Sequence, residues 1–480
     1  MKAAAATMAG AVFALTVPVS AASAAPVVDD SQLGSITIHK FERPSTPTGL
    51  PNNGTAVDTT GLTPLAGIGF TIQQVNTIDL STNAGWDAAH NLSSVFNPAD
   101  PAGSITGAGY TLGTGVTQTT ATDGTAAFGS LPVGLYLVTE TSYPSGVTPS
   151  APFLISVPLT DPNNQNNWIY DVHAYPKNSV TGAEKTVTDI DDVKLGDQIE
   201  FTITGDIPNE AVIDGYKIVD QLNTKLTYVG AVATLVDGSA TLVAGTDYNV
   251  IFDAATNTVS VEFTDAGRAV LAAHNTTKVQ VVLTTTVNAI GEIANVASVY
   301  PNAASFSIAP GQPGGPVVTP PVETKWGEIT LKKIDQNGAA LAGASFSVYA
   351  TEADALAGTN PITLGGQTVF TVAADGTLTI SGLRYSDFAN DGTVTPRNYY
   401  LVETTAPDGY ELLAEPIAFQ VNATTTVAGV DLNVTNTPSN AGFQLPLTGG
   451  AGTGLLYVAG GLIVAGAGLL FFRSRRTSEN

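Results

Sequence analysis

Apolar and polar residues alternate with a period of two along most of this chain, in runs of a few residues each. Gly, Asn and Asp separate one run from the next, which is the pattern of β-strands joined by tight turns. Thr, Val, Ala and Gly are abundant, and this composition suits half-buried strands. We therefore predict an all-β chain of tandem β-sandwich domains. The one helix that the pattern favours is short, around residues 264–274.

Charge balance and cysteine content exclude several classes of protein. The formal net charge is −23 at pH 7, which argues against binding to nucleic acid or to anionic membrane surfaces. There is no Cys, so no disulfide stabilises the domains. Because no metal-ligand cluster appears, we expect no metal, no cofactor and no enzymatic turnover. The four histidines are scattered along the sequence: His39, His90, His173 and His274.

Both ends of the chain carry export signals. Residues 1–25 place a Lys before an Ala- and Val-rich stretch with small residues near its end, which predicts a signal peptide. An uncharged apolar run, 451–472, has about the length that a membrane-spanning helix needs. The basic residues of 473–480 follow it and are expected to stay cytoplasmic. The apolar run alone fits a permanent tail anchor equally well.

The pentapeptide before the apolar run favours a different interpretation. It consists of Leu445, Pro446, Leu447, Thr448 and Gly449. It resembles the LPxTG motif that sortases cut between Thr and Gly, and it stands in the expected order before an apolar run and a basic tail. The resemblance implies that the membrane helix is transient and that Thr448 is captured as an acyl-enzyme. We therefore predict a secreted, cell wall-anchored protein whose precursor passes through the plasma membrane.

The mature chain divides at two changes of composition. A first boundary follows residue 179, and a Pro-rich stretch at 303–323 is predicted to be a stiff, extended linker. The predicted domains are 26–179, 180–302 and 324–438, with a spacer and the sorting motif at 439–450. The first and third are diverged copies of one unit. An insertion between about residues 76 and 117 of the first copy is expected to form surface loops.

Charged and amide side chains fall on the apolar face of several predicted strands. Residues i and i+2 of a strand share a face, so Lys333 lies in phase with Leu331, and Glu403 with Leu401. A strand end, where a Lys reaches water, would explain any single case. Because all three domains show a Lys, a carboxyl and an Asn in this phase, we predict one buried site of these three residues in each domain. The three sets are Lys40, Glu140 and Asn178; Lys185, Asp220 and Asn295; and Lys333, Glu403 and Asn436.

A chemical reaction would remove the cost of burying these charges. Desolvation lowers the pKa of a Lys and raises that of a carboxyl, so both can be neutral together. A neutral amine is a nucleophile, and a protonated carboxyl can shuttle protons as ammonia leaves. We therefore predict one Lys–Asn amide in each domain. Closing a loop of about 100 residues would stabilise each by roughly 4–5 kcal/mol if the loop-entropy model for disulfides applies.

The third domain resembles a collagen-adhesin B-type (Cna-B) Ig-like repeat, because residues 399–410 (YYLVETTAPDGY) match the E-box of that family. The resemblance implies that Lys333 and Asn436 form the bond and that Glu403 catalyses it. The middle domain is similar to the A-type (Cna-A) adhesin domain, which implies Asp220 as catalyst of a bond between Lys185 and Asn295. The first domain keeps its three residues but departs from the E-box after Thr141.

Residues 168–178 (WIYDVHAYPKN) resemble the pilin motif of major pilins, with Ala174 in place of a Val. Lys177 lies opposite in phase to Asn178, so one side chain faces solvent while its neighbour points inward. Pro176 cannot donate a ladder hydrogen bond, which suits an edge or terminal position. The resemblance implies that Lys177 attacks the Thr448 acyl-sortase of another subunit, whereas a solvated Lys at a domain junction is the structural alternative.

Together, these features resemble SpaA-like backbone pilins and predict the shaft subunit of a covalent cell-surface pilus that supports adhesion or biofilm. The expected partners are a pilus-specific class C sortase, a housekeeping sortase, other copies of the chain, peptidoglycan and a tip or base minor pilin. A monomeric wall-anchored adhesin with crosslinked stalk domains is the competing interpretation. The pilin motif and the lack of a large additional domain argue against it.

Overall fold

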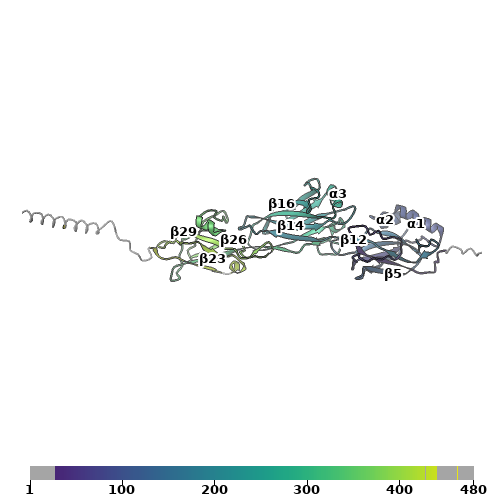
Figure 1. The fold of residues 1–480 in the computed structure, drawn as a ribbon, viewed down its shortest axis with the longest axis horizontal. Helices are drawn as coiled ribbons and strands as arrows, with labels where there is room; N and C mark the ends of the chain where they lie inside the picture. Colours follow the sequence, from purple (N-terminus) through teal and green to yellow (C-terminus); the bar gives the residue numbers. More distant parts are fainter. Residues whose placement is uncertain (1–26, 428, 440–461, 463–480) are drawn as a thin grey trace, which may run out of the picture.

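The computed structural model describes residues 27–427, 429–439 and 462. The predicted signal peptide (1–25), the sorting motif (445–449) and the basic tail lie outside the described residues, as does the predicted apolar segment apart from residue 462. Across the described part of the chain, no helix is long and apolar enough to cross a bilayer. The fold is mostly β-sheet, as predicted, and Figure 1 shows three sandwich units in a row.

The first unit packs two sheets against each other, with strand orders β11-β1-β5 and β4-β3-β6-β8. Its core includes Ile36, Ile38, Phe70 and Val138, all from alternating positions of the strands. Its elements are β1 (Gly34–His39), β2 (Phe41–Glu42), β3 (Gly69–Gln74), α1 (Asn83–Val95), α2 (Pro101–Gly107), β4 (Val116–Thr119), β5 (Thr125–Leu131), β6 (Gly134–Ser142), β7 (Val147–Thr148), β8 (Phe153–Val157), β9 (Leu159–Thr160), β10 (Trp168–Ile169), β11 (Asp171–Ala174) and β12 (Lys177–Val180).

The insertion of the first unit contains two helices, so the prediction of surface loops was wrong. Thr82 caps α1 by accepting a hydrogen bond from the Gly85 N–H, at 3.0 Å. Ala89 and Leu92 then lie on one face of α1 and pack against the sheet. These apolar contacts and the N-cap hold a helix in a segment whose Asn, Gly and Ser residues are also common in loops.

The middle unit packs a sheet of order β13-β14-β19-β16 against one of order β17-β18-β15-β21-β22. The predicted helix is confirmed as α3, which begins after its N-cap Thr264. The elements are β13 (Ala183–Thr188), β14 (Gln198–Asp206), β15 (Lys217–Gln221), β16 (Leu226–Leu235), β17 (Tyr248–Asp253), β18 (Thr258–Phe263), α3 (Asp265–Ala273), β19 (Lys278–Val287), β20 (Gly291–Asn295), β21 (Ala297–Tyr300), the 3-10 helix η1 (Ala304–Ser307) and β22 (Val317–Val318).

The third unit packs β23, β26 and β31 against a sheet of order β25-β24-β29-β30. β23 pairs β31 in parallel, so its first and last strands lie side by side. The elements are β23 (Val322–Ile334), β24 (Ser345–Tyr349), α4 (Glu352–Ala357), β25 (Phe370–Thr371), β26 (Thr377–Arg384), β27 (Phe388–Ala389), β28 (Gly392–Thr393), β29 (Tyr399–Thr405), β30 (Ile417–Phe419), α5 (Ala423–Val427) and β31 (Leu432–Thr435).

The Pro-rich stretch at 303–323 is not a free, extended linker, and that expectation is corrected. It contains η1, and β22 adds to the sheet of the middle unit by pairing with β21. The next strand, β23, pairs with β20 of the middle unit through its first half and with β26 through its second half. One continuous strand therefore joins the middle and third units, and Trp326 on it is buried in the core of the middle unit.

Carboxylates gather at this junction. Asp189 is fully buried and accepts hydrogen bonds from the Thr324 hydroxyl at 2.5 Å and from the Asn390 N–H at 2.6 Å. Asp192 is half-buried close to Asp189 and Asp197. Burial first, and then the negative charges of Asp197 and Asp189, raise the pKa of Asp192 from 3.8 to about 6.

The pKa of Asp192 predicts a pH-dependent stability. The folded chain holds the Asp192 proton more tightly than the unfolded chain, so ionisation of this carboxyl opposes folding at pH 7, and the penalty vanishes as the pH falls to about 4. Asp192→Asn should raise the melting temperature at pH 7 by about 2–4 °C, since solvent screening limits the effect to about 1 kcal/mol. Calorimetry at pH 7 and pH 4 measures this, and an equal gain at both pH values would contradict it.

Candidate functional site: three buried Lys–carboxyl–Asn sets

In the third unit, the parallel pairing of β23 with β31 brings Lys333 beside the end of β31, where Asn436 follows. Both side chains are buried, and the Lys333 amine contacts Asn436 Oδ1 directly and donates to the Val434 carbonyl at 3.1 Å. Glu403 comes from β29 on the opposite sheet. Its two oxygens accept from Asn436 Nδ2 at 3.1 and 2.9 Å, and Oε1 lies 3.7 Å from the Lys333 amine.

In the first unit, Lys40 lies between β1 and β2, and Asn178 lies on β12, which pairs in parallel with β2. Glu140 of β6 bridges the two: its Oε2 lies 2.9 Å from the Lys40 amine, and its Oε1 accepts from Asn178 Nδ2 at 2.5 Å. Asn178 Oδ1 is buried without a hydrogen-bond partner among the described residues. The carboxylate therefore stands between the amine and the amide.

In the middle unit, the three residues come from β13, β15 and β20. The Lys185 amine lies 2.5 Å from Asp220 Oδ2, and the same oxygen accepts weakly from Asn295 Nδ2 at 3.4 Å. The Phe201 ring covers the Lys185 amine at 5.0 Å. The second oxygen of Asp220 and Oδ1 of Asn295 have no partner in the described part of the chain.

Burial shifts the pKa values of the three lysines and of Asp220 in the direction that favours their neutral forms. Desolvation lowers the pKa of Lys40 to about 8, against the opposing effect of Glu140. It likewise lowers the pKa values of Lys185 and Lys333, and it raises the pKa of Asp220. The structure thus brings together all three predicted sets, in buried sites that make a neutral amine accessible.

Several contacts within these sites were not predicted. The backbone N–H of Leu413 donates to Glu403 Oε2 at 3.0 Å, and the Glu411 carbonyl accepts from Asn436 Nδ2 at 2.8 Å. In the first unit, Ser150 contacts both Lys40 and Glu140. Ser150 follows Glu140 by ten residues, as Leu413 follows Glu403, but no sequence pattern marks either position as part of a site.

Lys177, expected to face solvent, is partly exposed on β12, directly before the buried Asn178. Its side chain makes no ion pair within the described residues and lines a cavity of about 90 Å³ with Tyr175 and Leu62. His39 Nε2 and His173 Nδ1 lie 2.9 Å apart near this motif, so two of the histidines that are scattered in sequence meet in space. No group of three His, Asp or Glu that could hold a metal occurs in the described part of the chain.

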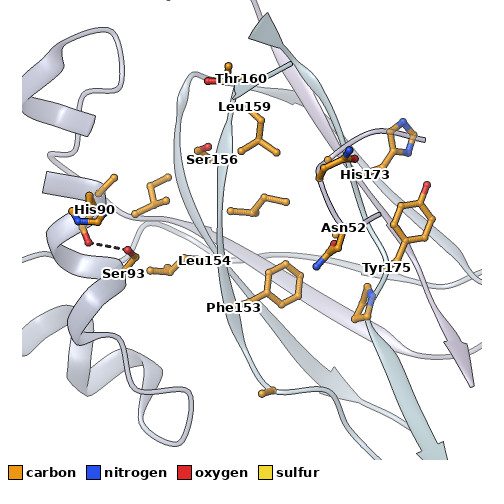
Figure 2. A pocket seen from close by; sticks show the side chains of 18 of the residues that line it. Asn52, His90, Ser93, Phe153, Leu154, Ser156, Leu159, Thr160, His173 and Tyr175 are labelled. Carbon is orange, nitrogen blue, oxygen red and sulfur yellow. Dashed lines mark hydrogen bonds between the residues drawn. The ribbon is translucent and has the colours of Figure 1, made fainter. Parts of the chain in front are cut away.

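A groove of about 800 Å³ lies on the first unit, and its lining includes Tyr175 and Pro176 of the motif that contains Lys177. Figure 2 shows His90 and Ser93 of α1 on one side of it, His173 and Tyr175 on the other, and Phe153 between them. Apolar and aromatic residues such as Trp86, Leu135 and Phe153 line it together with Asn, Ser, Thr and His side chains. The insertion helix α1 therefore forms one wall of a groove whose lining also includes residues of the motif around Lys177.

Comparison with known proteins supplies the family. Residues 31–179 match the model of the Gram-positive pilin subunit D1, N-terminal domain; residues 327–436 match a prealbumin-like fold domain; and residues 437–479 match the LPXTG cell wall anchor motif. Fimbrial subunit type 1 of Actinomyces viscosus is 34% identical over 525 residues, which cover 98% of this chain and 97% of that protein. This chain belongs to the Gram-positive fimbrial subunits.

Other relatives and solved structures agree with this assignment. Fimbrial subunit type 2 of Actinomyces naeslundii is 31% identical, covering 94% of this pilin and 92% of its relative. The full-length major pilin SpaD of Corynebacterium diphtheriae is 28% identical with a TM-score of 0.66, covering 86% of this chain and 98% of that chain. The major pilin SpaA of the same organism is 27% identical with a TM-score of 0.61, over 84% and 99% of the two chains.

The family fixes the broad role of the molecule. This pilin is a structural subunit and not an enzyme, and its anchor motif marks it as a sortase substrate attached to peptidoglycan in a cell-surface pilus. The anchor match also agrees with the predicted wall location. The sorting threonine itself lies outside the described residues.

Proposed function

We propose that this pilin forms the shaft of a covalent pilus, in which Lys177 of one subunit is joined to Thr448 of the next. The place of Lys177 on β12, partly exposed and directly before the buried Asn178, carries the proposal. The amine attacks the Thr448 acyl-sortase carbonyl, the new amide forms, and the sortase thiol leaves. Contacts of this kind are head-to-tail and non-closing, so they build fibres. A pilus-specific class C sortase would catalyse polymerisation, and a housekeeping sortase would attach the fibre to peptidoglycan.

The groove whose lining includes Tyr175 and Pro176 supports the approach of a second subunit to Lys177. The segment before Thr448, residues 443–447 (FQLPL), is uncharged and apolar apart from Gln444. A segment of this composition suits a groove lined by Trp86, Phe153 and Tyr175 near the attacking amine. Wall extracts distinguish the pilus from a monomeric anchored adhesin: a polymer gives an SDS-resistant ladder, and the adhesin gives one band.

We propose further that each unit closes one intramolecular Lys–Asn amide. The carboxyl first takes a proton from the lysine ammonium, which frees the amine lone pair. The amine then attacks the Asn side-chain carbon, the C–N bond to Lys forms and the bond to Nδ2 breaks. The carboxyl gives its proton to Nδ2, which leaves as ammonia, and takes a second proton from the lysine nitrogen as the amide forms, so the carboxyl ends protonated and atoms and charge balance. The direct contact between the Lys333 amine and Asn436 Oδ1 gives this step its strongest support.

Glu403→Ala should leave the third unit uncrosslinked, because it removes the carboxyl that accepts both hydrogen bonds from Asn436 Nδ2 and lies beside the Lys333 amine. The intact mass of the mature chain should rise by one ammonia relative to the value expected from the substitution alone. The third unit should also lose about 5 kcal/mol of stability if loop entropy governs the effect. Mass spectrometry and thermal unfolding measure the two.

Glu415→Ala is the matched control, since Glu415 is an exposed carboxyl of the same unit. It should leave the mass deficit unchanged. If the unmodified third unit shows no mass deficit, the proposed bond is refuted irrespective of how either variant behaves.

A further inference from the structure

Ser150 of the first unit holds a position for which the third unit has no counterpart hydroxyl. Its backbone N–H donates to Glu140 Oε2 at 3.1 Å, and its hydroxyl donates to the same oxygen at 2.9 Å. The hydroxyl oxygen also accepts a hydrogen bond from the Lys40 amine at 3.1 Å. Ser150 therefore contacts both partners of the buried ion pair with one side-chain atom.

The third unit offers the comparison for this position, because it has a backbone donor to its carboxylate at the equivalent residue. Leu413 lies ten residues after Glu403, as Ser150 lies ten after Glu140, and its backbone N–H makes the equivalent bond to the carboxylate at 3.0 Å. Only the backbone contact is shared. The Lys333 amine contacts Asn436 Oδ1, and Glu403 Oε1 lies 3.7 Å from the amine.

In the first unit, the Lys40 amine lies against the Glu140 carboxylate and makes no hydrogen bond to Asn178 Oδ1. The Lys40 amine contacts Glu140 and Ser150, while Asn178 Oδ1 has no hydrogen-bond partner among the described residues. Three donors converge on Glu140 Oε2: the Lys40 amine and the two groups of Ser150. Donors of this kind stabilise the ionised carboxylate, and a hydroxyl acceptor stabilises the lysine ammonium.

We infer that Ser150 is a positioning residue that holds Lys40 and Glu140 as an ion pair and thereby slows closure of the first-unit amide relative to that of the third unit. The inference rests on the proposed Lys–Asn reaction. Proton transfer from Lys40 to Glu140 must precede attack on Asn178, and the Ser150 hydroxyl stabilises the state before that transfer. After this proton transfer, the Lys40 amine attacks Asn178, the Lys–Asn bond forms and ammonia leaves.

Timed synthesis of the whole mature chain tests this. Cell-free translation is started and stopped at known times, and the crosslinked peptide of each unit is quantified by mass spectrometry. In the unmodified chain the first unit should close later than the third. Ser150→Ala should speed closure of the first unit about tenfold or more, the value of one hydrogen bond to a charged group. Ser150→Thr keeps the hydroxyl and should keep the slow rate, which a merely structural role would not require.

The reciprocal variant transfers the effect to the third unit. Leu413→Ser places a hydroxyl ten residues after Glu403 and should slow closure there, with the first unit unchanged as an internal control. If both units close but Ser150→Ala is no faster, or if the first unit closes as fast as the third in the unmodified chain, the role of Ser150 is overturned while the proposed reaction stands. If neither unit ever loses ammonia, the proposed reaction itself fails.

Discussion

Lys177→Ala should reduce the SDS-resistant ladder in wall extracts to a single anchored species. The substitution removes the amine that would attack the acyl-enzyme. Ala should leave the fold unchanged, because Lys177 is partly exposed and makes no ion pair with the described residues. The sorting motif is untouched, so the chain should still reach the wall as a monomer. Electrophoresis of muramidase-released wall protein, followed by immunoblotting, measures the loss of all bands above the monomer.

Lys278→Ala provides the control for this experiment. Lys278 is an exposed lysine of the middle unit, paired with Asp206 at 3.1 Å, and lies outside the pilin motif. Its removal should leave the ladder at full intensity. A ladder that persists in Lys177→Ala cells would mean that another lysine forms the linkage. A single band from the unmodified gene would favour the monomeric adhesin.

The phase of strand residues was sufficient to put Lys333 and Glu403 on the core faces of their strands. Alternation alone put Lys333 and Glu403 on core faces, and the structure has both buried in one site. This works because a strand turned by one residue would expose its whole apolar set, so the register is strongly determined. The same logic placed Lys177 outside and Asn178 inside on neighbouring positions of β12.

Features that depend on pairing between distant segments were not predictable in the same way. The Pro-rich stretch at 303–323 reads as a linker because Pro and Gly are typical of linkers, yet β22 within it finds a partner in β21. The continuity of β23 across two units depends on its pairing with β20, and no local sequence pattern identifies that pairing. Ser150 was missed because its function comes from contacts with Lys40 and Glu140, more than a hundred residues and ten residues away.

The position of Lys177 determines which crosslinks carry load in the proposed fibre. Tension enters a subunit at Lys177 and leaves at its own Thr448, so residues 27–176 lie outside the loaded path. The amide between Lys40 and Asn178 would carry no load, because Asn178 lies on the loaded path and Lys40 does not. In the third unit, by contrast, an amide between Lys333 and Asn436 would bypass every residue between them.

Lys333→Met should therefore make the fibre extensible, whereas Lys40→Met should not, since Met keeps the volume of each buried side chain and removes only the amine. Lys333 and Asn436 are 103 residues apart, which corresponds to about 340–370 Å of fully extended chain. Pulling single fibres should show one added step of that length per subunit in Lys333→Met. Lys40→Met fibres should match the unmodified ones. An added step in Lys40→Met would mean that the load passes through the first unit, and thus that the subunits are joined somewhere other than Lys177.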